Sequence, residues 1–223
     1  MPDAWKPGLV RLFASHLAEH CLAVSGVAEA MEPYGFGTFV AHQTIGITTD
    51  WRNEIERALA ACDCMVVFAH PAFHESDWTD QEFGWALGRG VPIVVVAYPG
   101  TKLLGFVEKY QAIVVPDSGM TAPDLARQIT ESFIARDDFR GRVIDGLISA
   151  LGYADSYVRA GTTAEMLDAH YDELRRSDMI AILHAHVTNH EVGEATLARR
   201  PLRRLVEKRA PDLLAAFFPG DGS

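Results

Sequence analysis

The sequence has few cysteines and no excess of positive charge. Three of its 223 residues are cysteine, an odd number that does not support a disulfide framework and fits a reducing compartment. Twenty Lys and Arg stand against 30 Asp and Glu, so the formal net charge is −10. An acidic chain of this kind is a poor general binder of nucleic acid or of an anionic membrane.

Long hydrophobic runs are also missing. No stretch approaches membrane-spanning length, and the N-terminus lacks the basic and then apolar segments of a signal peptide. We therefore expect a cytoplasmic protein with no membrane contact. No G-x-G-x-x-G follows the first apolar run, which argues against a Rossmann-type hydride-transfer site.

Short, continuously apolar runs are present and alternate with segments of helical period. Continuous apolarity is typical of parallel strands that are covered on both faces. The runs lie at residues 10–14, 37–41, 64–69, 92–97 and 112–115, and the predicted helices at 18–34, 50–61, 78–89, 103–110 and from 121 onward. This pattern predicts an α/β fold with a flavodoxin-like five-stranded parallel sheet, strand order 2-1-3-4-5, and helices on both faces.

Beyond about residue 137 the pattern becomes entirely helical. We expect an α/β domain over residues 8–135 and a C-terminal helical extension over residues 136–223. Within the extension, His186 and His190 have a spacing that can bind zinc on a helix, although surface or packed histidines are the favoured interpretation. The basic run 199–209 contains spaced leucines, which predicts an amphipathic helix with a cationic face.

The strand order predicts where a ligand would bind. Ligands of open α/β sheets lie at the carboxyl ends of the strands, where the connection reverses, here between the first and third strands. The first strand delivers Phe13, Ser15 and His16 to this crevice, and the third delivers the start of the helix 78–89. Glu82 lies on the border of that helix's sheet-facing stripe, and the pattern alone leaves open a solvated glutamate or a site carboxylate.

Several segments resemble the TIR (Toll/interleukin-1 receptor) domain, particularly its bacterial members. They are LFASH, VAHQTIGITTDW, ERALAACD and FHESDWTDQEFGWALGRGVPIVVV, and the likeness covers roughly residues 10–110. Its most specific part is W-x-x-x-E at Trp78 and Glu82. In TIR enzymes the glutamate of this motif cleaves the nicotinamide–ribose bond of NAD. The resemblance therefore implies that Glu82 is catalytic, that NAD is the substrate, and that no metal or other cofactor is needed.

The resemblance also implies contacts with the substrate, from the end of the first strand, from the BB loop (residues 42–50), and from two tryptophans beside the ribose. The residues at these positions are Phe13, Ser15, His16, His42, Ile45, Trp51 and Trp78. The BB loop departs from the family pattern, because His42 stands where many members have an acidic residue and Gly46 is shifted. Transfer to water would give ADP-ribose and transfer to an internal nucleophile a cyclic product, and both stay open.

TIR domains also act as binding modules, so the resemblance implies self-association through the TIR domain and its BB loop. It implies a setting in bacterial antiphage immune signalling, and the helical tail offers a surface for a partner protein. Two alternatives stay open. One is a scaffold without activity; the other is an enzyme like the nucleoside 2-deoxyribosyltransferases, which CDCMVVFA and EFGWALGRGVP also resemble.

Overall fold

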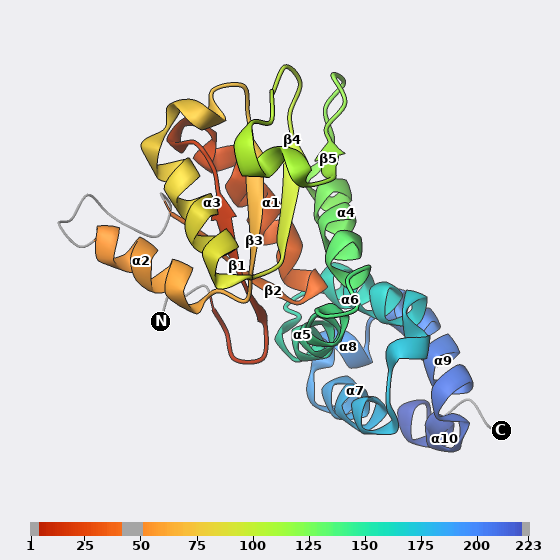
Figure 1. Ribbon diagram of the computed structural model, residues 1–223. Coiled ribbons are helices and arrows are strands. Elements are labelled where there is room, and N and C mark those ends of the chain that lie inside the picture. Colours follow the sequence, from red (N-terminus) through yellow and green to blue (C-terminus); the bar gives the residue numbers. More distant parts are fainter. Residues whose placement is uncertain (1–4, 42–50, 220–223) are drawn as a thin grey trace. The chain divides into compact units, whose positions relative to one another are not determined.

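The computed structural model describes residues 5–41 and 51–219, excluding the side chain of Trp51. The chain forms two compact units (Figure 1), the first from residues 1–32 and 37–139 and the second from residues 33–36 and 140–223. Across the described residues, no helix combines the length and the apolarity needed to cross a membrane.

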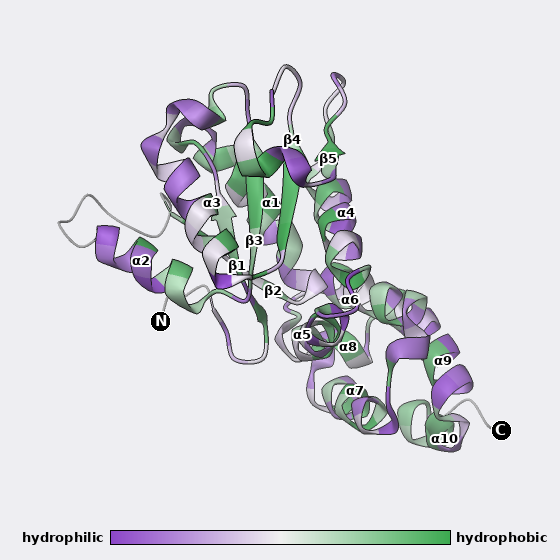
Figure 2. Cartoon of the chain, viewed as in Figure 1, coloured by the Kyte–Doolittle hydropathy of each residue, from purple (hydrophilic) through white to green (hydrophobic). Residues whose placement is uncertain are grey.

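The first unit contains a five-stranded parallel sheet in the order β2-β1-β3-β4-β5, as predicted. The central strands β3 and β4 are hydrophobic along their length (Figure 2), because both of their faces are covered. The strands are β1 (Val10–Ser15), β2 (Phe36–Val40), β3 (Cys64–Ala69), β4 (Ile93–Ala97) and β5 (Ala112–Val114). The order in which successive strands are added to the sheet reverses between the parallel strands β1 and β3, where Ser15 is the register partner of Val67.

Helices cover both faces of this sheet (Figure 1), which confirms the predicted layers. The helices α2 (Trp51–Ala61) and α3 (Asp77–Arg89) pack on one face, over a core that includes Phe13, Val67 and Phe83. The helices α1 (Cys21–Met31) and α4 (Ala122–Ile134) pack together on the other face.

Two predicted helices differ from the structure. The segment 103–110 forms only a 3₁₀ helix, η4 (Gly105–Lys109), and the φ of 65° at Gly105 prevents an α-helix from continuing through that residue. The predicted helix 18–34 is divided into η1 (Ala18–His20), α1 and η2 (Glu32–Tyr34). Pro33 lacks the N–H that an α-helix would need at that point.

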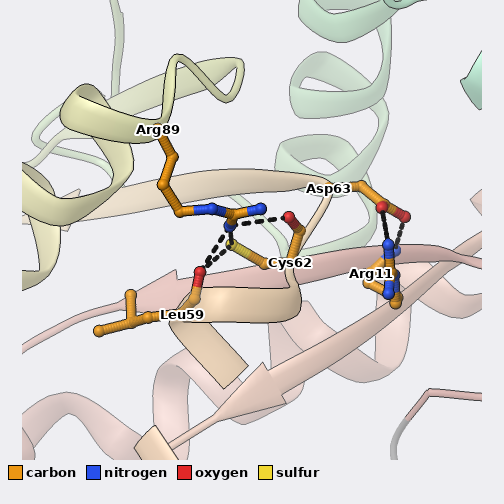
Figure 3. Close-up of polar contacts among 5 residues, drawn as sticks. All are labelled: Arg11, Leu59, Cys62, Asp63 and Arg89. Atoms are coloured by element: carbon orange, nitrogen blue, oxygen red, sulfur yellow. Dashed lines mark hydrogen bonds and ion pairs between the residues drawn. The ribbon is translucent and has the colours of Figure 1, made fainter. Parts of the chain in front are cut away.

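The amino ends of the strands are closed by a set of polar contacts (Figure 3). The Arg89 guanidinium, at the end of α3, donates to the Leu59 carbonyl at 2.6 Å and to the Cys62 carbonyl at 3.1 Å. These carbonyls lie at the C-terminal end of α2, where a cation is favoured. Asp63 accepts hydrogen bonds from the backbone N–H of Arg11 at 2.9 Å and from its Nε at 3.1 Å. Cys62 precedes β3, and its sulfur accepts a hydrogen bond from the Arg89 guanidinium at 3.4 Å.

The second unit is helical, as predicted for the end of the chain. Its close packing depends on Gly161, where a Cβ atom would approach the Leu197 Cβ to 2.7 Å. Its helices are α5 (Arg140–Tyr153), α6 (Tyr157–Ala169), η5 (Tyr171–Glu173), α7 (Arg176–Thr188), α8 (His190–Gly193), α9 (Thr196–Arg209), η6 (Pro211–Leu213) and α10 (Leu214–Phe217).

Several cations of the basic run are paired inside this unit. Asp168 on α6 is buried and accepts hydrogen bonds from Arg204 at 2.7 Å and Lys208 at 3.2 Å. The side-chain amide of Asn189 joins three helix ends: its Nδ2 donates to the carbonyls of Leu151 and Ala154, both at 3.0 Å, and its Oδ1 accepts from the Glu191 N–H. Both the cations of the basic run and the Asn189 amide therefore stabilise the helical unit itself.

Candidate functional site

A hydrogen-bonded pair, Ser15 and Glu82, lies at the carboxyl edge of the sheet. Ser15 is the last residue of β1, at the point where the strand order reverses, and its hydroxyl donates to Glu82 Oε2 at 2.6 Å. Only 6% of Glu82 is exposed and Ser15 is fully buried. The interpretation of Glu82 as a solvated glutamate is therefore wrong.

The start of α3 is fixed firmly, and this positions Glu82. The Thr79 hydroxyl, in the first turn, donates to the Phe73 carbonyl at 2.6 Å and ties the helix to the preceding loop. Phe83 and Ala86 then anchor the helix to the sheet, while Gly90 ends it with a φ of 68°. Because helical side chains lean toward the N-terminus, Glu82 reaches back toward the strand ends.

The surroundings of Glu82 disfavour its charged form. Burial raises the pKa of its carboxyl to about 7, and the hydrogen bond from Ser15 opposes this rise only in part. The other buried carboxylates of the described residues differ. Asp168 is paired with two cations, and Asp178 accepts the backbone N–H of Arg175 at 2.7 Å and also contacts its guanidinium. No cation among the described residues pairs with the Glu82 carboxylate.

The other predicted site residues differ in how far they are exposed. His16 follows Ser15 and is buried, with its Nδ1 at 2.8 Å from the Leu17 carbonyl oxygen. Trp78 is 39% exposed, and the Arg52 guanidinium lies 5.7 Å from the centre of its ring. Phe13 is fully buried in the core, 5.5 Å from Phe39 between ring centres, and does not reach the surface.

Three further predicted positions belong to the BB loop and its end. His42 and Ile45 lie outside the described residues, and of Trp51 only its place at the start of α2 is described.

Sequence reasoning missed a stack of three rings at the same edge of the sheet. The His70 ring lies between His20 and Tyr98, with ring centres 3.4 and 3.9 Å away and interplanar angles of 13°. His70 directly follows β3, Tyr98 directly follows β4, and His20 ends η1. A signal was present, because parallel strands end at one edge, so the residues after β3 and β4 must be neighbours.

Two other features lie away from Glu82. A cavity of about 520 Å³ between α3 and η4 is lined by residues that include His74, Phe83 and Phe106, but not Glu82. In the helical unit, His186 Nε2 is 2.8 Å from the Phe217 carbonyl oxygen. Among the described residues no cluster of His, Cys, Asp and Glu has the arrangement of a metal site.

The family model of the TIR domain matches residues 12–128, just over half of the chain. The chain belongs to the TIR domain family. The matched part contains the reversal point of the sheet, Ser15, and the W-x-x-x-E motif of this TIR domain. No match was found among curated proteins or among solved structures.

Proposed function

We propose that this TIR domain protein cleaves the nicotinamide–ribose bond of NAD, with Glu82 as the catalytic residue. The observation that supports this proposal is the Glu82 carboxylate, buried at the reversal point of the sheet. Its partner there is the Ser15 hydroxyl, and no cation pairs with it in the described part of the chain. A buried acid whose pKa is shifted to about 7 is typical of a functional site. Carboxylates of this kind act on glycosidic bonds elsewhere.

The reaction needs a negative charge at this position. When the bond between C1′ of ribose and the nicotinamide nitrogen breaks, its electron pair leaves with nicotinamide, which departs neutral. Positive charge develops on the ribose ring, and a fixed anion stabilises it. Water then bonds to C1′ and loses a proton, which gives ADP-ribose; if a ring nitrogen of adenine bonds instead, the product is cyclic.

The described neighbours of Glu82 fit this role. Ser15 orients the carboxylate through its hydrogen bond, and Trp78 lies one turn earlier on α3. The substrate's positively charged nicotinamide riboside would favour the ionised form of Glu82. Turnover at low substrate concentration should therefore depend on pH near 7, and saturating NAD should shift this dependence to lower pH.

A chromatographic assay of NAD tests the proposal. The purified full chain, assayed dilute and concentrated, should release nicotinamide, and Glu82→Ala and Glu82→Gln should not. Glu75→Gln, an exposed glutamate on the loop before α3, is the matched control and should keep full activity. Equal nicotinamide release by the Glu82 variants would contradict the assignment.

The same assay separates the alternatives. A scaffold would release no nicotinamide at any concentration, and a deoxyribosyltransferase would exchange the bases of deoxynucleosides and leave NAD intact. We further propose that the protein assembles through its TIR domain, binds a partner through its helical tail, and acts in bacterial antiphage immunity. TIR domains generally self-associate, so activity that rises more steeply than protein concentration would support assembly.

A further inference from the structure

The stack of His20, His70 and Tyr98 places polar histidine rings where hydrophobic rings would also fill the space. His70 is 8% exposed, and a hydrophobic ring would fill the same space without burying nitrogen atoms. Its Nδ1 lies 3.2 Å from the Phe68 carbonyl oxygen, which fixes the ring by a hydrogen bond. Burial, followed by the nearby His20, lowers the pKa of His70 to about 4, so its ring is neutral at physiological pH.

The rings lie nearly parallel, whereas aromatic side chains of protein cores often meet edge to face. Parallel, closely spaced rings are the arrangement in which nucleobases stack on protein side chains. The end ring, His20, keeps 30% of its side chain exposed, so the stack is accessible to solvent there. A flat heterocycle can therefore extend the stack at His20.

The stack is close to the Ser15–Glu82 pair but on the other side of the sheet. Ser15 is the register partner of Val67, and His70 lies three residues further along the same strand direction. Three residues of strand span roughly 10 Å. Ala69 faces the core under α2 and α3, so His70 faces the α1 side, where it meets His20. The two groups are thus offset by roughly 10 Å along the strand direction, a separation that an extended dinucleotide can span.

Charge favours one orientation of that ligand. Glu82 is a carboxylate and attracts the positively charged nicotinamide riboside. At the stack, the central ring is neutral, because burial lowers the pKa of His70 to about 4. The carboxylate therefore suits the charged pyridinium end of the dinucleotide, and the neutral ring stack suits the uncharged adenine end.

We propose that the His20–His70–Tyr98 stack binds the adenine ring of NAD, with the dinucleotide crossing the carboxyl edge of the sheet from Glu82 to His20. This inference rests on the proposed function for the identity of the whole ligand. The binding of adenine can be tested independently of NAD cleavage, because AMP, which lacks nicotinamide, should still bind at the stack.

Calorimetric titration with AMP tests the inference without any turnover. His20→Ala should weaken AMP binding roughly 5- to 100-fold, the usual effect of removing a ring on which a base stacks. His20→Phe keeps a flat ring and should bind AMP nearly as well as the wild type. The matched control is His74→Ala, which removes a partly exposed histidine from the loop before α3 and should leave AMP binding unchanged.

A comparison of two substrates supplies the second measurement. His20→Ala should raise the KM for NAD and leave kcat, and the KM for nicotinamide mononucleotide, unchanged, because the mononucleotide has no adenine. No AMP binding by the wild type, equal AMP binding by His20→Ala, or an equal rise in KM for both substrates would overturn the inference. Binding of AMP through His20 without nicotinamide release would refute the proposed function alone.

Discussion

Two carboxylates lie at opposite edges of the same sheet and have opposite surroundings. Asp63, at the amino edge, accepts hydrogen bonds from the backbone and the guanidinium of Arg11. Glu82, at the carboxyl edge, is buried and accepts one hydroxyl from Ser15. A carboxylate whose charge is balanced by the fold contributes to stability, whereas a buried and unbalanced one is kept at a cost that binding or catalysis can repay.

The sharpest contrast should appear in activity. Glu82→Gln should lower kcat/KM for nicotinamide release roughly 10²- to 10³-fold, as expected for the loss of one electrostatic contact with the transition state. Asp63→Asn should leave the rate per folded molecule unchanged and lower the free energy of unfolding by about 1–3 kcal/mol, because Arg11 loses its charged partner. Chromatographic rates and urea titrations measure the two effects. Similar rate losses in both variants would contradict the assignment of a catalytic role to Glu82 and a structural role to Asp63.

Stability should respond in the opposite sense at the carboxyl edge. The pKa of Glu82 is about 7 in the folded protein against 4.5 ordinarily, so the folded state holds this proton more tightly than the unfolded state. Its contribution to stability is therefore present below pH 4.5, declines as the pH rises, and is lost above about pH 7. Glu82→Gln removes this decline and should raise the free energy of unfolding by roughly 3 kcal/mol at pH 8.

Urea titrations of wild type and Glu82→Gln at pH 5 and pH 8 measure this difference. The two proteins should differ far less at pH 5 than at pH 8. A variant that is less stable than the wild type at both pH values would show that the carboxylate is structural after all.

At the amino edge, Arg89 should matter for stability alone. Arg89→Met keeps most of the apolar stem and removes the donors to the Leu59 and Cys62 carbonyls. The free energy of unfolding should fall by about 1–2 kcal/mol, with no change in kcat. Thermal unfolding followed by circular dichroism measures the loss, and a fall in kcat at unchanged folding would show that the two edges are coupled.

The smallest effect should come from Ser15→Ala, which leaves Glu82 without its hydrogen bond. That bond lowers the pKa of Glu82, so its removal should raise the pKa further. Activity then falls at pH 7, roughly fivefold for a pKa shift of one unit, because the ionised fraction of Glu82 falls, and it recovers as the pH rises. The profile of kcat/KM from pH 6 to pH 9 measures this shift. A uniform loss at every pH would indicate damage to the site instead.

The apolar runs around Val67 and Val95 predicted the sheet, its order and its layers, because burial on both faces depends on local composition. The helical end of the chain was predicted from a different signal, the helical spacing of its apolar residues. The W-x-x-x-E motif pointed to Glu82 through its likeness to the TIR family.

Contacts between distant segments were beyond prediction. The burial of Glu82 depends on Ser15, 67 residues earlier, and a residue on the border of a helical stripe has no local signal for it. The ring stack joins His20 to His70 and Tyr98 from three separate segments. The predicted helix 103–110 is interrupted at Gly105 by a positive φ, which composition does not specify.

Asn189 has a consequence for how the second unit unfolds. Asn189 holds the end of α5 through its Nδ2 and the first turn of α8 through its Oδ1, and its backbone N–H caps α7, so opening any of these helix ends displaces the residue that the other two contact. The three ends should therefore exchange their amide hydrogens as one cooperative group. Aspartate at this position would keep the cap of α8 and lose the donor to α5, which would divide that group in two.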